Sequence, residues 1–256
     1  KKIPKLPNKS LALVISAIVS FVVSSAFMQK IMLVINGTAF GGNPDPVFGL
    51  DISYYMFQKP VIEMFLFYFI VLFVGLSIYM ALYYIIAFNR YFDGIDGKML
   101  RESLFMKKLT RNIFLVIIGI ALLTLVNTQN MLLGKILKVN EDLEIVGAGL
   151  TETTVKLWGY VIFTFVIVIF AYRALKYFKE GKTSKVLKNL AVIPGYLVIL
   201  FLVMVVFDVF FVNSNELDKE KEFIAENIEN TRNAYNINIE EANLENSGTI
   251  TEEEVE

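Results

Sequence analysis

Four carboxylates and three serines lie in or beside apolar stretches of this sequence and have the chemistry for a binding role. Asp45, Asp51 and Glu63 follow one another in a glycine-rich region, and carboxylate oxygens are the ligands that a hard cation such as Ca²⁺ takes. The region lacks the regular Asp-x-Asx-x-Asx-Gly spacing of a calcium loop, and Asp45 before Pro46 is equally typical of a turn. We therefore predict no metal and no other cofactor, and keep the three acids as candidate loop residues.

Asp208 is the only charged residue in the stretch 190–212. An acid inside a membrane span is by default a functional candidate, and its expected partner is a cation or a polar group on a neighbouring helix. The alternative is that Asp208 lies within reach of the outer interface and is simply solvated. Its position near one end of the stretch favours the solvated interpretation.

Ser16, Ser20 and Ser24 recur at a spacing of four and so share one face of a helix. Small residues let helices approach closely in lipid, which predicts that this face packs on another span. A proton or ion path along the face is the alternative.

The sequence contains no Cys and no His. This excludes disulfides and thiolate sites, and it removes the commonest general base and metal ligand. A membrane-embedded hydrolase would then need carboxylates or Ser–Lys pairs that converge at one depth, and the sequence shows no such pattern. We predict no catalytic residue and favour a protein that is not an enzyme, while an active site in another part of a longer protein stays open.

The composition predicts a membrane-embedded protein. Hydrophobic residues make up 55% and charged residues 19% of the chain, and the net charge of −1 hides an asymmetry. Residues 213–256 hold 13 acids against three basic residues, whereas residues 1–10 hold four lysines and no acid. The acidic end disfavours nucleic acid as a partner and leaves the lipid bilayer as the expected one.

Residues 190–212 are the clearest membrane span. As a helix rising about 1.5 Å per residue they can cross a bilayer, and 17 of them are Leu, Ile, Val or Phe. At about −0.3 to −0.6 kcal/mol each, these outweigh about +2.5 to +3.5 kcal/mol for an acid at the helix centre. Similar runs predict five spans in all, near residues 11–28, 61–88, 109–128, 157–174 and 190–212.

Two of these spans have alternatives. The lysines before residues 11–28 resemble the start of a signal peptide, but the run is 18 residues long and lacks a convincing cleavage site, so we predict a retained helix. The apolar core of the third span, residues 113–126, is short. It crosses only if residues 109–128 are helical and Arg111 extends its charge to the surface.

The basic residues predict the orientation of these spans. With five spans, residues 1–10, 89–112 and 173–189 share one side and carry four, six and six Lys or Arg, against two and three in residues 29–60 and 129–156. Because basic loops stay in the cytoplasm, we expect a multi-pass plasma-membrane protein with a cytoplasmic N-terminus and an extracytoplasmic C-terminus.

Shorter segments carry further predictions. Residues 215–236 read as a helix with a loose apolar face, and the polar stretch after Ile239 as disordered. Residues 131–139 are consistent with an interfacial amphipathic helix. Asn36-Gly37-Thr38 matches a glycosylation acceptor, although turn chemistry is favoured. The glycines at 147 and 149 are too few for a phosphate loop and are expected to give backbone freedom.

Three segments of the sequence form recognisable motifs. The first is Asn-Gly-Thr-Ala-Phe-Gly at 36–41 with Asp-Pro-Val-Phe-Gly at 45–49, Asp-Ile-Ser-Tyr-Tyr at 51–55 and Phe57-x-x-Pro60. The second is Asn-Glu-Leu at 215–217 with Glu-Phe-Ile at 222–224, Asn-Ile at 227–228, Thr-Arg at 231–232 and Ala-Tyr at 234–235, and the third is Gly-Ala-Gly-Leu-Thr at 147–151. These segments resemble motifs of the bacterial uncharacterised protein family 0182.

The resemblance extends over residues 36–237 and implies a multi-pass membrane protein with about seven spans and a large external domain. This chain therefore resembles a middle fragment. Residues 131–143 lack the aromatic and Arg-containing pattern expected there. The family has no agreed activity, so the resemblance implies topology and location, not chemistry.

Together these observations predict an all-α fold: a polytopic transmembrane helix bundle over residues 1–212, followed by an acidic extracytoplasmic segment, 213–256, that starts a larger soluble domain. The predicted function is an integral membrane protein of the bacterial envelope whose bundle anchors that domain. The alternative is a transporter or lipid-handling channel through the bundle. Substrate and oligomeric state stay open, including a homo-oligomer or an envelope protein partner.

Overall fold

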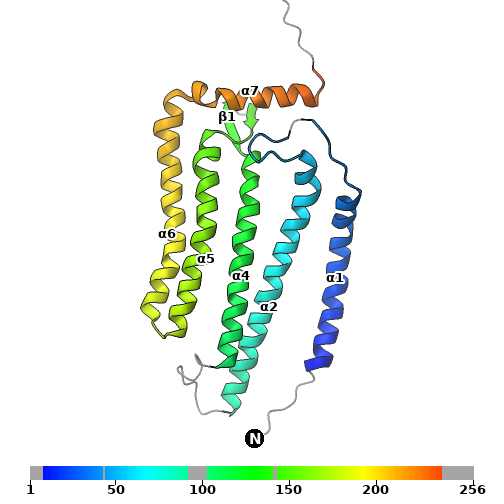
Figure 1. The fold of residues 1–256 in the computed structure, drawn as a ribbon, viewed down its shortest axis with the longest axis vertical. Helices are drawn as coiled ribbons and strands as arrows, with labels where there is room; N and C mark the ends of the chain where they lie inside the picture. The colour runs from blue at the N-terminus through cyan, green and yellow to red at the C-terminus, as the bar shows by residue number, and fades with distance from the viewer. Residues whose placement is uncertain (1–7, 43, 92–102, 141–142, 238–256) are drawn as a thin grey trace, which may run out of the picture.

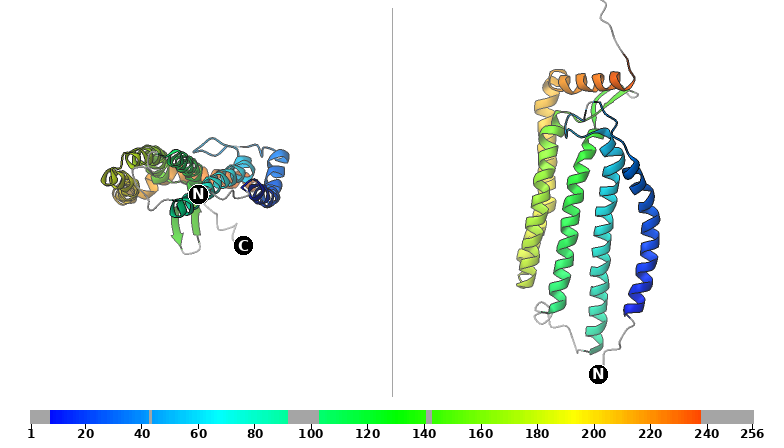
Figure 2. Two further views of the ribbon diagram at one scale, coloured as in Figure 1. Left: turned by 90° about the horizontal axis from the view of Figure 1, so that it is seen from below. Right: turned by 45° about the vertical axis from the view of Figure 1, so that its right-hand side comes forward.

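Five long helices stand side by side in chain order and form one curved layer (Figures 1 and 2). The computed structural model describes residues 8–42, 44–91, 103–140 and 143–237. The five helices are α1 (Asn8–Asn36), α2 (Lys59–Tyr91), α4 (Leu104–Thr128), α5 (Leu157–Lys179) and α6 (Thr183–Phe207). A further helix, α7 (Glu216–Ala234), lies across one end of the layer (Figure 1).

All five helices of the layer are long and apolar enough to cross a membrane. Large hydrophobic side chains, among them Phe21, Phe165 and Phe210, lie on the outside of the layer and are more than half exposed. An apolar surface of this extent suits lipid and not water. The prediction of an all-α polytopic bundle is confirmed.

The helices run past the apolar stretches that marked them in the sequence. α1 continues to Asn36, and α6 begins at Thr183, so that Pro194 lies inside the helix. A π-helical turn, Tyr54–Gln58, leads directly into α2, and Pro60 belongs to that helix. The hydrocarbon core of a bilayer determines how long the apolar stretch must be, but the helix itself can continue beyond that core into the headgroup layer.

Small residues let the helices of the layer approach one another. A Cβ on Gly119 of α4 would lie 2.8 Å from the side chain of Ile70 on α2. Gly159 of α5 packs in the same way against Leu200 of α6, and the Gly159 carbonyl accepts a hydrogen bond of 2.9 Å from the Tyr196 hydroxyl. Close packing and hydrogen bonds of this kind hold helices together where lipid offers no hydrophobic drive.

The prediction of an amphipathic helix over residues 131–139 is wrong. Only Gln129–Leu133 is helical, as a 3₁₀ turn, and it ends at Gly134, whose backbone is extended. Strand β1 (Lys135–Asn140) then pairs with β2 (Leu143–Val146) in an antiparallel hairpin. The Gly147 N–H donates to the Gly134 carbonyl at 2.7 Å, so a cross-strand bond takes the place of a continued helix.

The two ends of the layer differ and are named here for what they carry. The α7 end comprises α7, the loop 37–53, the turn 147–151, and the segments where α2 begins and α4 ends, residues 54–63 and 128–133. The opposite end is the helical hairpin between α5 and α6, residues 173–189, where Gly181 has a φ of +74°. It is called the hairpin end here and is distinct from the β1–β2 hairpin, which lies near α7 (Figure 1). The predicted disorder after Ile239 lies outside the described residues.

Candidate functional site

The loop 37–53 at the α7 end is organised around the carboxylate of Asp45. This carboxylate accepts hydrogen bonds from the backbone N–H groups of Val47 (3.0 Å), Phe48 (2.7 Å) and Leu50 (2.9 Å). The Tyr55 hydroxyl donates a fourth, at 2.8 Å. Asp45 therefore satisfies the donors of its own turn, and its oxygens are committed to the protein.

Asp51 holds the other half of the same loop. Its carboxylate accepts from the backbone N–H groups of Phe40 (3.3 Å), Gly41 (3.2 Å) and Ser53 (2.7 Å). Hydrogen bonds from Ser53, first from its side chain and then from its backbone, hold the pKa of Asp51 below its ordinary value, because they favour the ionised form. Asp51 thus fastens the start of the loop to its end.

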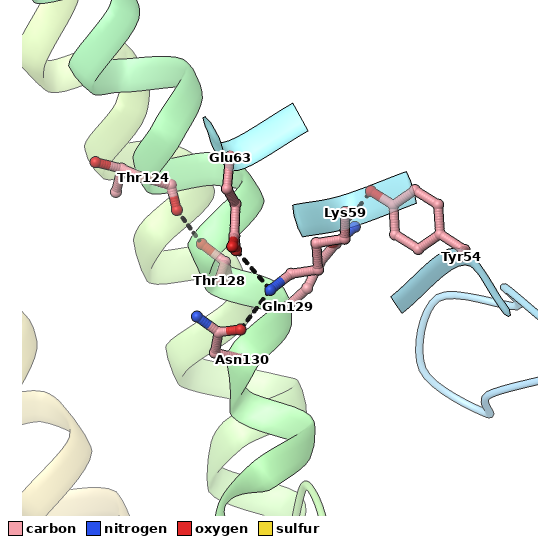
Figure 3. A network of polar contacts seen from close by, with 7 residues as sticks. All are labelled: Tyr54, Lys59, Glu63, Thr124, Thr128, Gln129 and Asn130. Atoms are coloured by element: carbon pink, nitrogen blue, oxygen red, sulfur yellow. Dashed lines mark hydrogen bonds and ion pairs between the residues drawn. The ribbon is translucent and has the colours of Figure 1, made fainter. Parts of the chain in front are cut away.

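A polar network joins the start of α2 and the π-helical turn before it to the 3₁₀ turn that follows α4 (Figure 3). The Lys59 ammonium group forms an ion pair of 2.7 Å with Glu63 and donates to the side-chain oxygen of Asn130. Beside it, the Tyr54 hydroxyl donates to the Gln129 side chain at 3.3 Å. Lys59 is only 7% exposed, and a buried charge is tolerated only when it is paired. The network therefore depends on Lys59.

One buried acid of α7, Glu220, connects this helix to the turn 147–151. Glu220 is 4% exposed, and its two carboxylate oxygens lie 3.0 and 3.2 Å from the Leu150 N–H that donates to them. A Cβ on Gly149 would lie 2.9 Å from both of these oxygens. A side chain at position 149 would therefore force the Glu220 carboxylate to shift.

Asp208 lies beside the same turn. It begins the π-helical turn Asp208–Val212 at the end of α6, is half-buried, and accepts a hydrogen bond of 3.3 Å from the Thr151 hydroxyl. Its partner is therefore a polar group on a neighbouring segment, as one of the two interpretations of the sequence anticipates. A functional role for Asp208 stays a prediction.

A cavity of about 710 Å³ at the α7 end is lined mainly by the loop 37–53, the turn 147–151 and α7. The loop contributes Pro44 and Val47, the turn contributes Ala148, and α7 contributes Glu226 and Asn230. The charged residues that line it are Asp45 and Glu226, both acidic. Within the described chain the cavity is therefore suited to neutral or cationic groups and not to anions.

The structure does not bring the predicted acids Asp45, Asp51 and Glu63 together. Each has its own partners in the protein, and the described residues contain no group of three acids suited to a metal ion. The Asn36 side chain donates to the Met32 carbonyl at 2.8 Å, and a Cβ on Gly37 would lie 2.8 Å from the Phe57 ring. Asn36 thus ends α1 with its side chain bonded to its own helix, and turn chemistry at residues 36–38 stays a prediction.

Ser16, Ser20 and Ser24 are all exposed on α1. The Ser16 hydroxyl donates to the Leu13 carbonyl of its own helix at 3.0 Å. Phe27 of α1 meets the Tyr68 ring of α2 edge to face, but no described helix of this chain covers the serine face. The packing role of these serines and the alternative of an ion path both stay predictions.

The sequence analysis missed Lys59 and Glu220. Lys59 could have been found, since it stands four residues before Glu63 at the start of an apolar run, and such a pair shares a helix face. Glu220 had a weaker signal: it lies three residues from Leu217 and four from Ile224, on the apolar face of the predicted helix. An acid in that phase needs a donor elsewhere, here the Leu150 N–H.

Comparison with known sequences finds relatives over nearly the whole chain. The sequence profile described as "Uncharacterised protein family (UPF0182)" matches residues 2–256. A UPF0182 protein of Caldicellulosiruptor saccharolyticus is 30% identical over 218 residues, which are 83% of this chain and 23% of the relative. A UPF0182 protein of Clostridium acetobutylicum is 27% identical over 271 residues, which are 97% of this chain and 28% of the relative.

A third relative, from Corynebacterium glutamicum, is 27% identical over 256 residues, covering 93% of this chain and 24% of its own length. The chain thus spans about a quarter of the length of these relatives. No solved structure matches it.

Proposed function

This chain belongs to the uncharacterised protein family UPF0182. We propose that its helix bundle is a membrane anchor that holds an extracytoplasmic domain against the extracytoplasmic face of the plasma membrane. The observation that carries the proposal is the position of α7. It follows the last membrane-compatible helix, lies across the end of the bundle (Figure 1), and is fastened there by the buried Glu220.

The α7 attachment is built to keep one orientation. A helix joined only through its N-terminal end would turn freely about that joint. Glu220 adds a second point, because both of its oxygens face one backbone N–H of the turn 147–151, and the Asp208–Thr151 bond fixes the turn against the end of α6. A domain that continues from α7 would inherit this fixed direction.

The distribution of charge supports an envelope orientation. The hairpin end carries six basic residues and one acid, while α7 and the residues after it are strongly acidic. Basic connections stay on the cytoplasmic side of a membrane. The hairpin end is accordingly cytoplasmic and the α7 end extracytoplasmic in this proposal, in a bacterial plasma membrane.

Cysteine labelling tests the orientation directly, since the chain has no native Cys. Glu222→Cys on α7 and Ser184→Cys at the hairpin end replace exposed residues. A membrane-impermeant maleimide added to intact cells is expected to label position 222, and to label position 184 only after permeabilisation. The opposite pattern would overturn the proposal.

The docking of α7 has its own test. In purified protein, Phe223→Cys and Glu222→Cys compare two neighbouring positions on α7 and leave Glu220 in place: Phe223 is half-buried and lines the cavity of the α7 end, whereas Glu222 is exposed. Slow modification at 223 and fast modification at 222 are expected if α7 stays docked. Equal rates at the two positions would contradict a fixed anchor even if the orientation is right.

The exposed serine face of α1 favours a second candidate, a transporter or lipid-handling channel. The five helices form a single layer (Figure 2), so a conduit lined by Ser16, Ser20 and Ser24 would need further helices beyond these five to close it. Cysteines at these positions would then react with polar thiol reagents in the membrane. If none of the three reacts, the conduit loses its support.

A further inference from the structure

The hairpin end is a concentrated basic surface. Residues 173–189 contain Arg173 and five lysines against one acid, Glu180, which gives a local charge of six minus one, or +5. Arg173 and all five lysines are exposed. So much like charge repels itself, and each group gains if an anion from outside the chain lies nearby.

The protein itself neutralises little of this charge. Glu180 pairs with Lys182 at 2.7 Å. Lys185 lies over the Tyr177 ring, with 5.4 Å between its ammonium nitrogen and the ring centroid, and Arg173 lies over the Phe170 ring at 5.6 Å. These ring contacts orient the two cations without cancelling their charge.

The start of α6 adds to the demand for an anion. A helix N-terminus carries a partial positive charge. The first turn of α6 contains no acid, and its N-cap residue, Lys182, makes no side-chain capping bond. Lys185 and Lys188 follow within the first two turns, so that side-chain cations and the positive end of the helix dipole share one place.

The depth of this surface identifies the kind of anion. From Arg173 to Lys179, α5 rises by about 9 Å, and the headgroup layer on each side of the hydrocarbon is roughly 5–8 Å thick. Lysine side chains can extend along the helix to stay in that layer. With α5 and α6 across a bilayer, these cations would lie at the level of the lipid headgroups, next to apolar helix surface that would face acyl chains.

Exposed apolar residues among the cations support a lipid environment. Tyr172, Phe178 and Leu187 are 57%, 41% and 68% exposed. Aromatic rings settle at the boundary between headgroups and hydrocarbon, which suits Tyr172 and Phe178. A surface made for a soluble acidic protein or a nucleic acid would have to be reached through the headgroup layer, and its apolar residues would face water.

We propose that the hairpin end, residues 173–189, is a binding site for the phosphate headgroups of anionic phospholipids, with Lys176, Lys179, Lys185 and Lys188 as the main contacts. Each cation near a charged lipid surface contributes to affinity, and the loss of one lowers it by about fivefold. The site does not depend on which side of the membrane the hairpin end faces, so its test is independent of the proposed anchor function.

The test is a lipid titration of the purified chain in a neutral detergent, followed by native mass spectrometry. Phosphatidylglycerol is the anionic probe and phosphatidylcholine the neutral one. We expect phosphatidylglycerol to bind at least about tenfold more tightly. The variant with Lys→Gln at positions 176, 179, 185 and 188 is expected to lose that preference and to keep its weak binding of phosphatidylcholine.

Two controls separate lipid recognition from a general effect of charge or folding. Lys→Arg at the same four positions keeps the charge and should keep the preference, and Lys221→Gln removes one exposed cation from α7 and should change nothing. Equal affinity for both lipids, or wild-type affinity in the Lys→Gln variant, would overturn the proposal. So would stronger binding of a single-stranded oligonucleotide or of polyglutamate than of phosphatidylglycerol.

Discussion

The two ends of this bundle treat charge in opposite ways. At the α7 end, two charged groups are buried and have partners within the protein: Lys59 pairs with Glu63 and Asn130, and Glu220 accepts from the Leu150 N–H. At the hairpin end, five lysines and an arginine stand exposed around one acid. The buried charges of the α7 end find their counter-charges and hydrogen-bond donors within the protein, whereas most cations of the hairpin end face solvent or lipid.

The difference teaches what each end can do. Buried, paired charges demand a fixed geometry, because a displaced partner leaves an uncompensated charge in an apolar place. Exposed charges tolerate many geometries and are screened by salt. The α7 end is thus suited to holding a structure in place, and the hairpin end to meeting a mobile charged surface. The predictions below set one end against the other, from the largest effect to the smallest.

Removing the buried cation should produce the largest effect. Lys59→Met leaves Glu63 and Asn130 without their partner, and breaking a buried pair costs about 3–5 kcal/mol. Because the Glu63 side chain is 31% exposed, water recovers part of this, and we expect about 2–3 kcal/mol of lost stability. Thermal unfolding in detergent measures it, with Lys179→Met at the hairpin end as the exposed control.

A second variant distinguishes a stranded charge from a lost contact. If the loss in Lys59→Met comes from the unpaired Glu63 carboxylate, then Lys59→Met with Glu63→Gln should recover part of the stability. Equal destabilisation by Lys59→Met and Lys179→Met would remove the contrast between the two ends.

The next effect concerns the attachment of α7. Gly149→Ala places a methyl group where the Glu220 carboxylate lies, 2.9 Å from both oxygens. The carboxylate must move, and the Leu150 N–H then loses its acceptor at a cost of about 1–2 kcal/mol. Hydrogen exchange at the Leu150 amide should quicken by about tenfold, since 1.4 kcal/mol corresponds to a factor of ten.

Gly195→Ala is the matched control for this variant. A Cβ at Gly195 meets open space, and alanine is the better helix former, so we expect unchanged exchange at Leu150 and a bundle at least as stable. If Gly149→Ala also leaves the Leu150 amide protected, then Glu220 is not what fastens the turn to α7.

Much of the layer could be predicted from the sequence, because lipid imposes long apolar helices that composition reveals. The five spans and the helix after the last one were predicted from apolar runs and charge. The short third span is an instructive case. α4 is helical from Leu104 to Thr128, so Arg111 lies on a helix that begins well before the apolar core.

The α7 end could be predicted only in part, because its contacts join segments far apart in the chain. Glu220 and Leu150 are 70 residues apart, and Lys59 and Asn130 are 71 apart. The prediction for residues 131–139 was wrong because their apolar spacing fits a helix, whereas the hydrogen bond from the Gly147 N–H to the Gly134 carbonyl starts a β-hairpin. The spacing of apolar residues within one segment does not reveal which other segment will hydrogen-bond to it.

A smaller effect should appear on acidification of the loop 37–53. The pKa of Asp51 is lowered from 3.8 in the folded protein, so the unfolded state binds the proton more tightly. The contribution of Asp51 is therefore fully present above pH 3.8 and is lost as the pH falls through the lowered value. Hydrogen-exchange protection of the Phe40, Gly41 and Ser53 amides should decline over that range.

Asp51→Asn is the control for the acid response. Its amide group does not titrate in this range, so the protection of the same three amides should already be reduced at neutral pH and should change less on acidification. The same decline in the wild type and in Asp51→Asn would assign the response to another group of the loop.

The smallest effect on stability should come from Glu180 at the hairpin end. Its ion pair with Lys182 is exposed, and exposed pairs contribute little because solvent competes for both charges. Glu180→Gln should therefore leave thermal unfolding unchanged. It should also raise the affinity of the hairpin end for phosphatidylglycerol by up to about fivefold, since one repelling charge is removed from the lipid contact. A variant that loses stability without gaining lipid affinity would show that Glu180 serves the fold, and that the hairpin end resembles the α7 end more closely than its exposed lysines indicate.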